Sequence, residues 1–185
     1  MTFPLEMTTN QLSISNIRAE THPHDDDDKA GSHAQSSNQV PSILIPLQEQ
    51  VLLLPRTAIA EIIPYLKPKS LPNAPRWLCG TVRWREQLLL LVSFEALQKK
   101  PAPALSNHAH IVILNTVRKD SNRKFYALII QNIPQLILAH TNNLSASPKA
   151  PNSPLLYCYA EINQIPVLIP NLEYLEKTLQ RCLTG

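Results

Sequence analysis

Proline is the residue that most restricts how this chain can fold, because it recurs among short apolar runs. The chain has 17 prolines, and Pro46 and Pro55 each close a run of large aliphatic residues. Proline removes a backbone N–H and clashes with the preceding turn inside a helix, so long helices are disfavoured. It is tolerated at the ends and edges of strands. The sequence therefore predicts a mainly β fold built from short strands.

Composition excludes several classes of protein. With 3 glycines in 185 residues, the chain has no Gly-rich loop of the kind that binds nucleotide phosphates. No apolar run approaches the ~20 residues that span a bilayer, and the first 20 residues lack the basic start and apolar stretch of a secretory signal. The 3 cysteines are too far apart for a zinc motif or a disulfide framework. We therefore expect a cytoplasmic protein without direct membrane insertion.

Charge divides the chain near residue 40. Residues 1–40 carry 2 basic and 6 acidic side chains, a net charge of −4, whereas residues 41–185 carry 15 and 8, a net charge of +7. Such a shift marks a solvated segment beside a folded unit. We predict a disordered polar and acidic tail over 1–40 and one domain over 41–185. The run Asp25–Lys29 resembles an enterokinase cleavage tag, and both a cloning remnant and a native acidic segment are consistent with it.

Apolar runs separated by two or three polar residues predict β-hairpins. Three hairpins are expected: Ile43–Leu47 with Val51–Pro55, Thr81–Trp84 with Gln87–Phe94, and Leu155–Glu161 with Ile165–Ile169. Further strands are expected at His110–Val117, Lys124–Ile130 and Gln135–His140, and a loop at Thr141–Ser153. Glu86 is a poor residue for a tight turn, so we expect a longer or bulged loop in the second hairpin. About ten short strands at this spacing are typical of β-barrels or a sandwich.

Helix signals are few and short. Thr57 is expected to cap a helix over Ala58–Ile63, which Pro64 closes. A single helical turn over Arg76–Cys79 would end at Gly80 as a left-handed C-cap. Asn171 is expected to cap a closing amphipathic helix, whose apolar face holds Leu172, Leu175, Leu179 and Cys182 or Leu183.

No catalytic or metal-binding constellation stands out in the sequence. His22, His24 and His33 lie near four aspartates and could hold zinc or nickel, but a solvated polar tail is the simpler interpretation. His108 and His110 share one face of a strand start without a third ligand. The 8 carboxylates after residue 40 are scattered, and no hydrolase or metalloprotease motif occurs. We expect a protein that is not an enzyme and that holds no metal and no cofactor.

A β-barrel nucleic-acid-binding module is the alternative from another class. Arg76, Arg83 and Arg85 stand beside Trp77 and Trp84 in the net-positive part of the chain. Exposed aromatic rings among basic residues would provide a surface on which bases stack. Aromatic residues make up only 5% of the chain, however, and solvated arginines account for the same pattern. No nucleic acid is therefore expected as a partner.

The stretch from Leu71 to Arg85, LPNAPRWLCGTVRWR, carries a family resemblance. It resembles the central motif of the CheW-like chemotaxis adaptors, which has Pro-Asn-Ala-Pro followed by an apolar trio and a glycine. Three further segments are similar to the family's Val-Gln-Glu-Ile helix, its Gly-Leu-Ile-Val-Asp segment, and its last hairpin with the closing helix: Ala58–Ile63, Tyr126–Gln131 and Leu155–Glu176. The resemblance covers roughly residues 42–179.

Within the family, two short stretches resemble a particular sub-type. Trp84-Arg85 and Ser93-Phe94-Glu95 look like signatures of the ChpC and PilI adaptors, which serve type IV pilus chemosensory systems and twitching motility. Three positions depart from the common family pattern, namely Glu86 in place of glycine, Leu90 in place of proline and Ser93 in place of aspartate. These departures indicate that contacts through this hairpin are weakened or tuned to another partner.

The resemblance implies a fold of two small five-stranded β-barrels with short helices and a C-terminal helix. It implies a non-catalytic adaptor that couples the cytoplasmic tip of a chemoreceptor to the regulatory domain of a CheA-type histidine kinase. The partner-binding residues that it implies on this chain are Ile59, Glu61, Ile62, Gly80, Arg83, Trp84 and Arg85.

Each of these residues also has a purely structural explanation. Ile59 and Ile62 would more often belong to the core than to an interface. Trp84 would pack inside a barrel and need a hydrogen-bond partner for its ring N–H. Gly80 would relieve a backbone clash, and Arg85 would simply be solvated. Which of Ile59, Ile62 and Ile63 faces outward is left open by the sequence.

Overall fold

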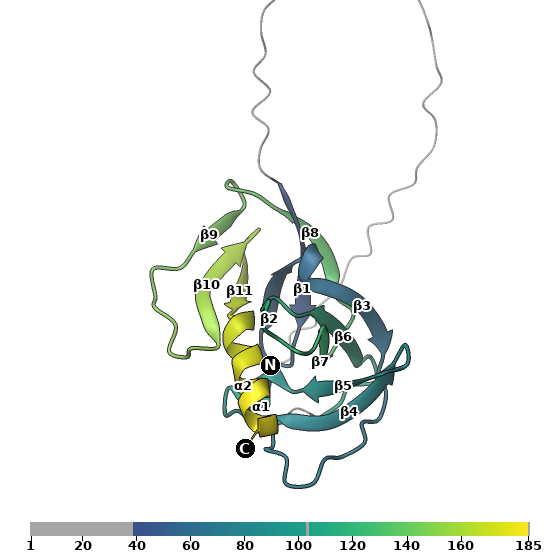
Figure 1. Cartoon of the computed structure of the whole chain (residues 1–185). Helices are drawn as coiled ribbons and strands as arrows, with labels where there is room; N and C mark the ends of the chain where they lie inside the picture. The colour runs from purple at the N-terminus through teal and green to yellow at the C-terminus, as the bar shows by residue number, and fades with distance from the viewer. Residues whose placement is uncertain (1–38, 103, 185) are drawn as a thin grey trace, which may run out of the picture. The chain divides into compact units, whose positions relative to one another are not determined.

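The computed structural model describes residues 39–102 and 104–184 and shows a mainly β chain with two antiparallel-dominated sheets (Figure 1). The six-stranded sheet contains, in spatial order, β8 Gln135–Ala139, β1 Val40–Pro46, β2 Val51–Pro55, β11 Ile165–Pro170, β10 Leu156–Ile162 and β9 Leu144–Ala146. The five-stranded sheet contains β3 Ile59–Pro64, β6 His110–Asn115, β7 Phe125–Ile130, β5 Gln87–Val92 and β4 Leu78–Trp84. The 3₁₀ turn η1 Arg56–Ala58 and the helices α1 Phe94–Leu97 and α2 Leu172–Thr184 complete the elements.

The predicted fold class is confirmed, with one sheet larger than expected. The additional strand is β9, which lies inside the segment predicted as the loop Thr141–Ser153. It pairs only with β10, through Leu144–Ala146. Three residues with one large apolar side chain give no periodic signal, so pairing with a neighbouring strand decides this element. The predicted tail lies outside the described residues up to position 38, and Val40 already belongs to β1.

The unbroken apolar runs arise because both faces of the central strands are buried. In β5, Leu89 and Leu91 lie in the interior of the five-stranded sheet, whereas Leu90 and Val92 face a second core. That second core also collects residues from the six-stranded sheet and from α2, including Ile45. A third, smaller cluster is formed by side chains from the strands of the six-stranded sheet. Since a strand alternates its side chains between two faces, one run of leucines supplies two cores.

All three predicted hairpins are present, but the turn of the second is tighter than expected. Strands β4 and β5 pair from Leu78 opposite Val92 to Trp84 opposite Gln87. Only Arg85 and Glu86 connect them, with φ angles of 41° and 57°. Positive φ at both central residues matches the right-handed twist of the flanking strands. The pairing of two extended strands thus imposes a conformation that neither side chain favours, and the expected longer or bulged loop is wrong.

The segment Ala58–Ile63 is not a helix. Arg56–Ala58 form the 3₁₀ turn η1, and no side chain caps it, so the expected cap by Thr57 is absent there. Ile59 then begins β3. Strand β3 then pairs with β6, with a bulge between Ile59 and Glu61. β-branched isoleucines favour a strand that packs against a neighbour, and Pro64 ends this strand rather than a helix.

The expected helical turn before Gly80 is likewise absent from the structure, because Leu78 already begins β4. Gly80 lies within that strand, at a bulge, with φ of 130°. A Cβ atom at this position would stand 2.3 Å from the carbonyl oxygen of Lys69. Gly80 is thus required by a close backbone approach inside a sheet, not by the end of a helix.

The closing helix α2 is confirmed together with its cap. The side-chain oxygen of Asn171 accepts the backbone N–H of Tyr174 at 3.0 Å, which satisfies one of the free donors of the first turn. Leu172, Leu175 and Leu179 are buried in the core between the sheets, whereas Leu183 is 43% exposed. No helix in the described part of the chain is long and apolar enough to cross a membrane.

Candidate protein-interaction surface

Three of the predicted residues meet at the junction of β3 with the β4–β5 turn. The indole N–H of Trp84 donates a hydrogen bond of 2.9 Å to Oε2 of Glu61. The same carboxylate oxygen pairs with the guanidinium of Arg85 at 2.7 Å. That guanidinium lies over the Trp84 ring, 4.7 Å from its centre. Two segments more than 20 residues apart in the sequence thus build one cluster.

The cluster is held in place by the buried tryptophan. Trp84 is 7% exposed and packs edge-on against Phe125, with ring centres 4.9 Å apart. A buried indole N–H needs an acceptor, and Glu61 supplies it from the opposite edge of the sheet. Strands β3 and β4 stand at the two ends of the sheet order, so this contact shows that the sheet curls toward closure. The predicted packing of Trp84 and its need for a partner are confirmed.

Arg85 and Glu61 remain accessible to a partner despite their mutual contact. Their side chains are 69% and 36% exposed, respectively. An ion pair of this exposure contributes little to stability because water screens it. Arg85 can therefore exchange its contact with Glu61 for a carboxylate on another protein at small cost. Its position over the Trp84 ring limits the directions from which such a carboxylate can approach.

The other predicted residues divide into exposed and buried ones. Ile62 is 38% exposed, and the side chain of Arg83 is 73% exposed and pairs with Glu86 at 3.1 Å. Ile59 is 4% exposed and belongs to the core between the sheets. Gly80 is buried against the Lys69 carbonyl. Ile59, Gly80 and Trp84 are therefore buried, whereas the side chains of Glu61, Ile62, Arg83 and Arg85 can touch a partner.

Leu88 is a surface residue that the sequence did not reveal. It stands opposite Arg83 in the β4–β5 register and is 65% exposed. It opens the run Leu88–Val92, whose other members are all buried, and hydropathy does not distinguish it from them. Its position in the sequence could have identified it. Leu88 is the second residue of β5 after the turn, and side chains so close to the tip of a hairpin can lie beyond the edge of the core. We refer to Glu61, Arg83, Arg85, Glu86 and Leu88 as the Arg85 surface.

The structure offers no support for the predicted alternative of base stacking by tryptophan. Trp84 is 7% exposed, packs against Phe125 and carries the Arg85 guanidinium over its ring, so little of the ring is open to a base. Trp77 is half-buried against the core between the sheets. Stacking on bases requires an open aromatic face, and neither tryptophan provides a free one.

The described residues contain no group of three or more potential metal ligands. His110 uses its Nδ1 atom in a 2.7 Å contact with the carbonyl oxygen of His108, so this pair is satisfied locally. The three histidines His22, His24 and His33 lie outside the described residues. The Arg85 surface itself presents exposed ion pairs and the apolar side chain of Leu88, which are contacts of the kind found at protein interfaces.

Comparison with known proteins agrees with a role in protein interaction and identifies the family. Residues 41–178 match the model of the CheW-like domain. The chain therefore belongs to the CheW-like family, whose members are scaffolds and adaptors of chemotaxis signalling rather than enzymes.

Among solved structures, the fold is similar to that of the scaffolding protein TtCheW from Thermoanaerobacter tengcongensis. The TM-score is 0.63 at 14% sequence identity, and the match covers 77% of this chain and 91% of that chain. No curated protein shows significant sequence similarity to this chain. At 14% sequence identity, this structural similarity shows that the two proteins share a fold.

Proposed function

We propose that this chain is a cytoplasmic, non-catalytic adaptor that couples chemoreceptors to a CheA-type histidine kinase by binding each through a separate surface. The observation that carries the proposal is the meeting of Glu61 and Arg85, which belong to two segments of the family resemblance, at one exposed place. A guanidinium held over an aromatic ring and paired with a half-exposed carboxylate is suited to reversible exchange with a partner's carboxylate.

The kinase regulatory domain is the partner assigned to the Arg85 surface. The surface combines two arginines with the exposed apolar side chain of Leu88 beside them. Arginine is enriched among the side chains that dominate binding energy at protein interfaces, and Leu88 adds exposed apolar area next to Arg83. The chemoreceptor tip is a helical hairpin in the family, and Ile62 on the adjoining strand is the apolar residue assigned to it.

Calorimetric titration of the full chain with the regulatory domain of a chemosensory kinase from the same source tests this assignment. Arg85→Ala is expected to weaken binding by about tenfold, the value of one charge-assisted contact. Lys177→Ala removes an exposed cation from α2, outside the surface, and should leave the affinity unchanged. Equal affinities for the wild type and Arg85→Ala, with equal thermal stability, would remove Arg85 from the interface.

Output to type IV pili is the second part of the proposal, and its support is the resemblance of Trp84-Arg85 and Ser93-Phe94-Glu95 to the ChpC and PilI signatures. Ser93 caps α1 by accepting the N–H of Ala96 and donates a hydrogen bond of 3.1 Å to the buried carboxylate of Glu95. Glu95 in turn accepts the backbone N–H of Gln48 from the β1–β2 turn at 3.4 Å. The signature therefore links the two sheets.

Deletion of the gene should abolish twitching and leave swimming intact; the reverse phenotype would contradict this part.

A further inference from the structure

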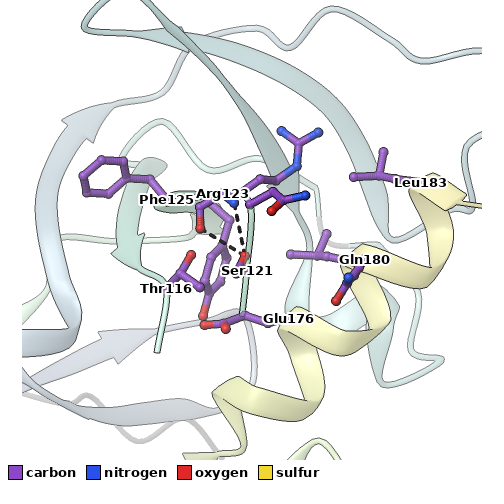
Figure 2. A pocket seen from close by; sticks show the side chains of 10 residues that line it. Thr116, Ser121, Arg123, Phe125, Glu176, Gln180 and Leu183 are labelled. Atoms are coloured by element: carbon purple, nitrogen blue, oxygen red, sulfur yellow. Dashed lines mark hydrogen bonds between the residues drawn. The ribbon is translucent and has the colours of Figure 1, made fainter. Parts of the chain in front are cut away.

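A buried carboxylate lies under α2, far along the chain from the Arg85 surface. Glu176 is 6% exposed, and its two oxygens accept the backbone N–H groups of Val117 at 2.8 Å and Arg118 at 3.1 Å. Figure 2 shows its side chain reaching from α2 toward the loop that carries Ser121. These two hydrogen bonds fasten the helix to the β6–β7 loop, but they do not neutralise the charge.

The charge of Arg118 acts on Glu176, but its guanidinium is engaged by other groups. Arg118, whose backbone touches the carboxylate, directs its guanidinium to Asp120 and to Gln180 instead. Figure 2 shows the guanidinium of Arg123 on the other side of the loop, pointing away from Glu176. Burial raises the pKa of Glu176, opposed by its two backbone hydrogen bonds and the charge of Arg118. A buried charge is costly unless it is paired.

A second buried polar group accompanies this carboxylate. Tyr126 is 2% exposed, and its hydroxyl lies close enough to the Glu176 carboxylate for the two side chains to interact, without a well-formed hydrogen bond to any described group. Burial, followed by the negative charge of Glu176, raises the pKa of Tyr126 well above 10. The hydroxyl therefore stays protonated and can both donate and accept a hydrogen bond. The Tyr126 hydroxyl and the Glu176 carboxylate therefore form one buried polar pair.

Both groups line an open cavity of about 210 Å³ between α2 and the β6–β7 loop. Its walls are apolar on the sides formed by Phe125, Leu179 and Leu183, and Gln180 is part of its polar rim. Cavities that hold drug-sized molecules span roughly 300–1,000 Å³. This one therefore suits a smaller molecule with an apolar body and one strongly polar end.

We propose that this cavity binds a small organic amine, whose ammonium group pairs with Glu176 and donates to the Tyr126 hydroxyl. An ammonium group carries only donors, which match a carboxylate and a hydroxyl that both have free lone pairs. It also places a positive charge in direct contact with the carboxylate. The apolar body of the ligand packs between Leu179 and Leu183, and binding ties α2 more firmly to the β6–β7 loop. This site does not depend on the adaptor function.

Titration of the full chain with 2-phenylethylamine, followed by amide NMR shifts of Val117 and Arg118, tests the proposal. These two N–H groups donate to Glu176 and report directly on its charge environment. The amine should shift both signals saturably, 2-phenylethanol should bind about tenfold more weakly, and 3-phenylpropionate should not shift them. No shift with the amine, or equal affinity for the amine and the alcohol, would overturn it.

Three variants separate the carboxylate from the cavity. Glu176→Gln should lower the amine affinity about tenfold, whereas Glu173→Gln, an exposed carboxylate one turn earlier, should not. Leu183→Trp fills the cavity from its exposed rim without touching the hydrogen bonds of Glu176 and should abolish binding. If Glu176→Gln fails to fold, Leu183→Trp decides. Amine binding that survives Leu183→Trp would place the ligand elsewhere.

Discussion

At the scale of single residues, the Glu61 carboxylate serves two groups at once. It accepts the buried N–H of Trp84 at 2.9 Å and pairs with the exposed guanidinium of Arg85 at 2.7 Å. The first contact stabilises the fold, because an unmet buried donor carries its full desolvation cost. The second contact is screened and contributes little. One side chain thus joins the core to the surface that a partner would meet.

The two contacts can be separated by mutation. Glu61→Ala leaves the N–H of Trp84 without an acceptor and should lower the free energy of unfolding by about 1–2 kcal/mol. Glu61→Gln keeps a carbonyl acceptor for the indole and should lose less than half of that amount. Urea denaturation followed by tryptophan fluorescence measures both variants. Equal stability of Glu61→Ala and the wild type would show that Trp84 does not need this acceptor.

At the scale of elements, the β4–β5 hairpin holds its turn in a conformation that its residues disfavour. Arg85 and Glu86 both have positive φ, and a non-glycine residue there costs about 1 kcal/mol relative to glycine. The strain is maintained by the paired strands on either side. Its consequence is that Arg85 projects from the tip of a rigid hairpin rather than from a mobile loop.

Glu86→Gly is therefore expected to stabilise the chain. Relief of the positive φ should raise the free energy of unfolding by about 0.5–1 kcal/mol. Glu86→Ala is the matched control, because it also removes the pair with Arg83 but keeps a Cβ atom at the strained position. Chemical denaturation of the three proteins under one condition measures the difference. A gain in Glu86→Ala as large as that in Glu86→Gly would assign the effect to charge instead of backbone strain.

The attachment of α2 should depend on pH through Glu176. Its pKa in the folded chain is raised above the ordinary value of 4.5, chiefly by burial. The folded state therefore binds this proton more tightly than the unfolded state does. The stability that Glu176 contributes is fully present below the unfolded pKa and is lost as the pH rises through the folded pKa.

A pH series of urea unfolding for the wild type and Glu176→Gln isolates this effect. The glutamine does not titrate, so all other ionisable groups cancel in the difference between the two proteins. The wild type should be more stable than Glu176→Gln by its largest margin near pH 4, and the margin should shrink toward pH 7. A margin that is constant, or that grows with pH, would show that the hydrogen bonds from Val117 and Arg118 outweigh burial.

At the scale of the whole molecule, the sequence predicted the elements whose ends are marked by local chemistry. The three hairpins and α2 are delimited by prolines, by polar turns and by the Asn171 cap, and all of these are present. The segment Ala58–Ile63 was misassigned because a short apolar run fits a helix and a strand equally well. Its pairing with β6, more than 45 residues later, decides between them.

The candidate site follows the same pattern. The resemblance named Glu61, Trp84 and Arg85, and the structure brings these three together. Sequence periodicity could not separate buried Ile59 from exposed Ile62, since a bulge shifts the register between them. Sequence periodicity could not identify Leu88 as exposed either. The exposure of a residue near the tip of a hairpin depends on how far the packed core extends toward that tip. Contacts set by distant segments are the part that local patterns do not encode.

The central claim is that a chemosensory kinase binds this chain at the Arg85 surface. The most direct test is amide NMR of the labelled full chain, recorded during titration with the kinase regulatory domain. The account predicts that the perturbed signals cluster on Arg83–Leu88 and on Glu61, while those of β9 and β10 stay in place. Saturable binding whose shifts fall on β9 and β10, with Arg83–Leu88 unaffected, would contradict it.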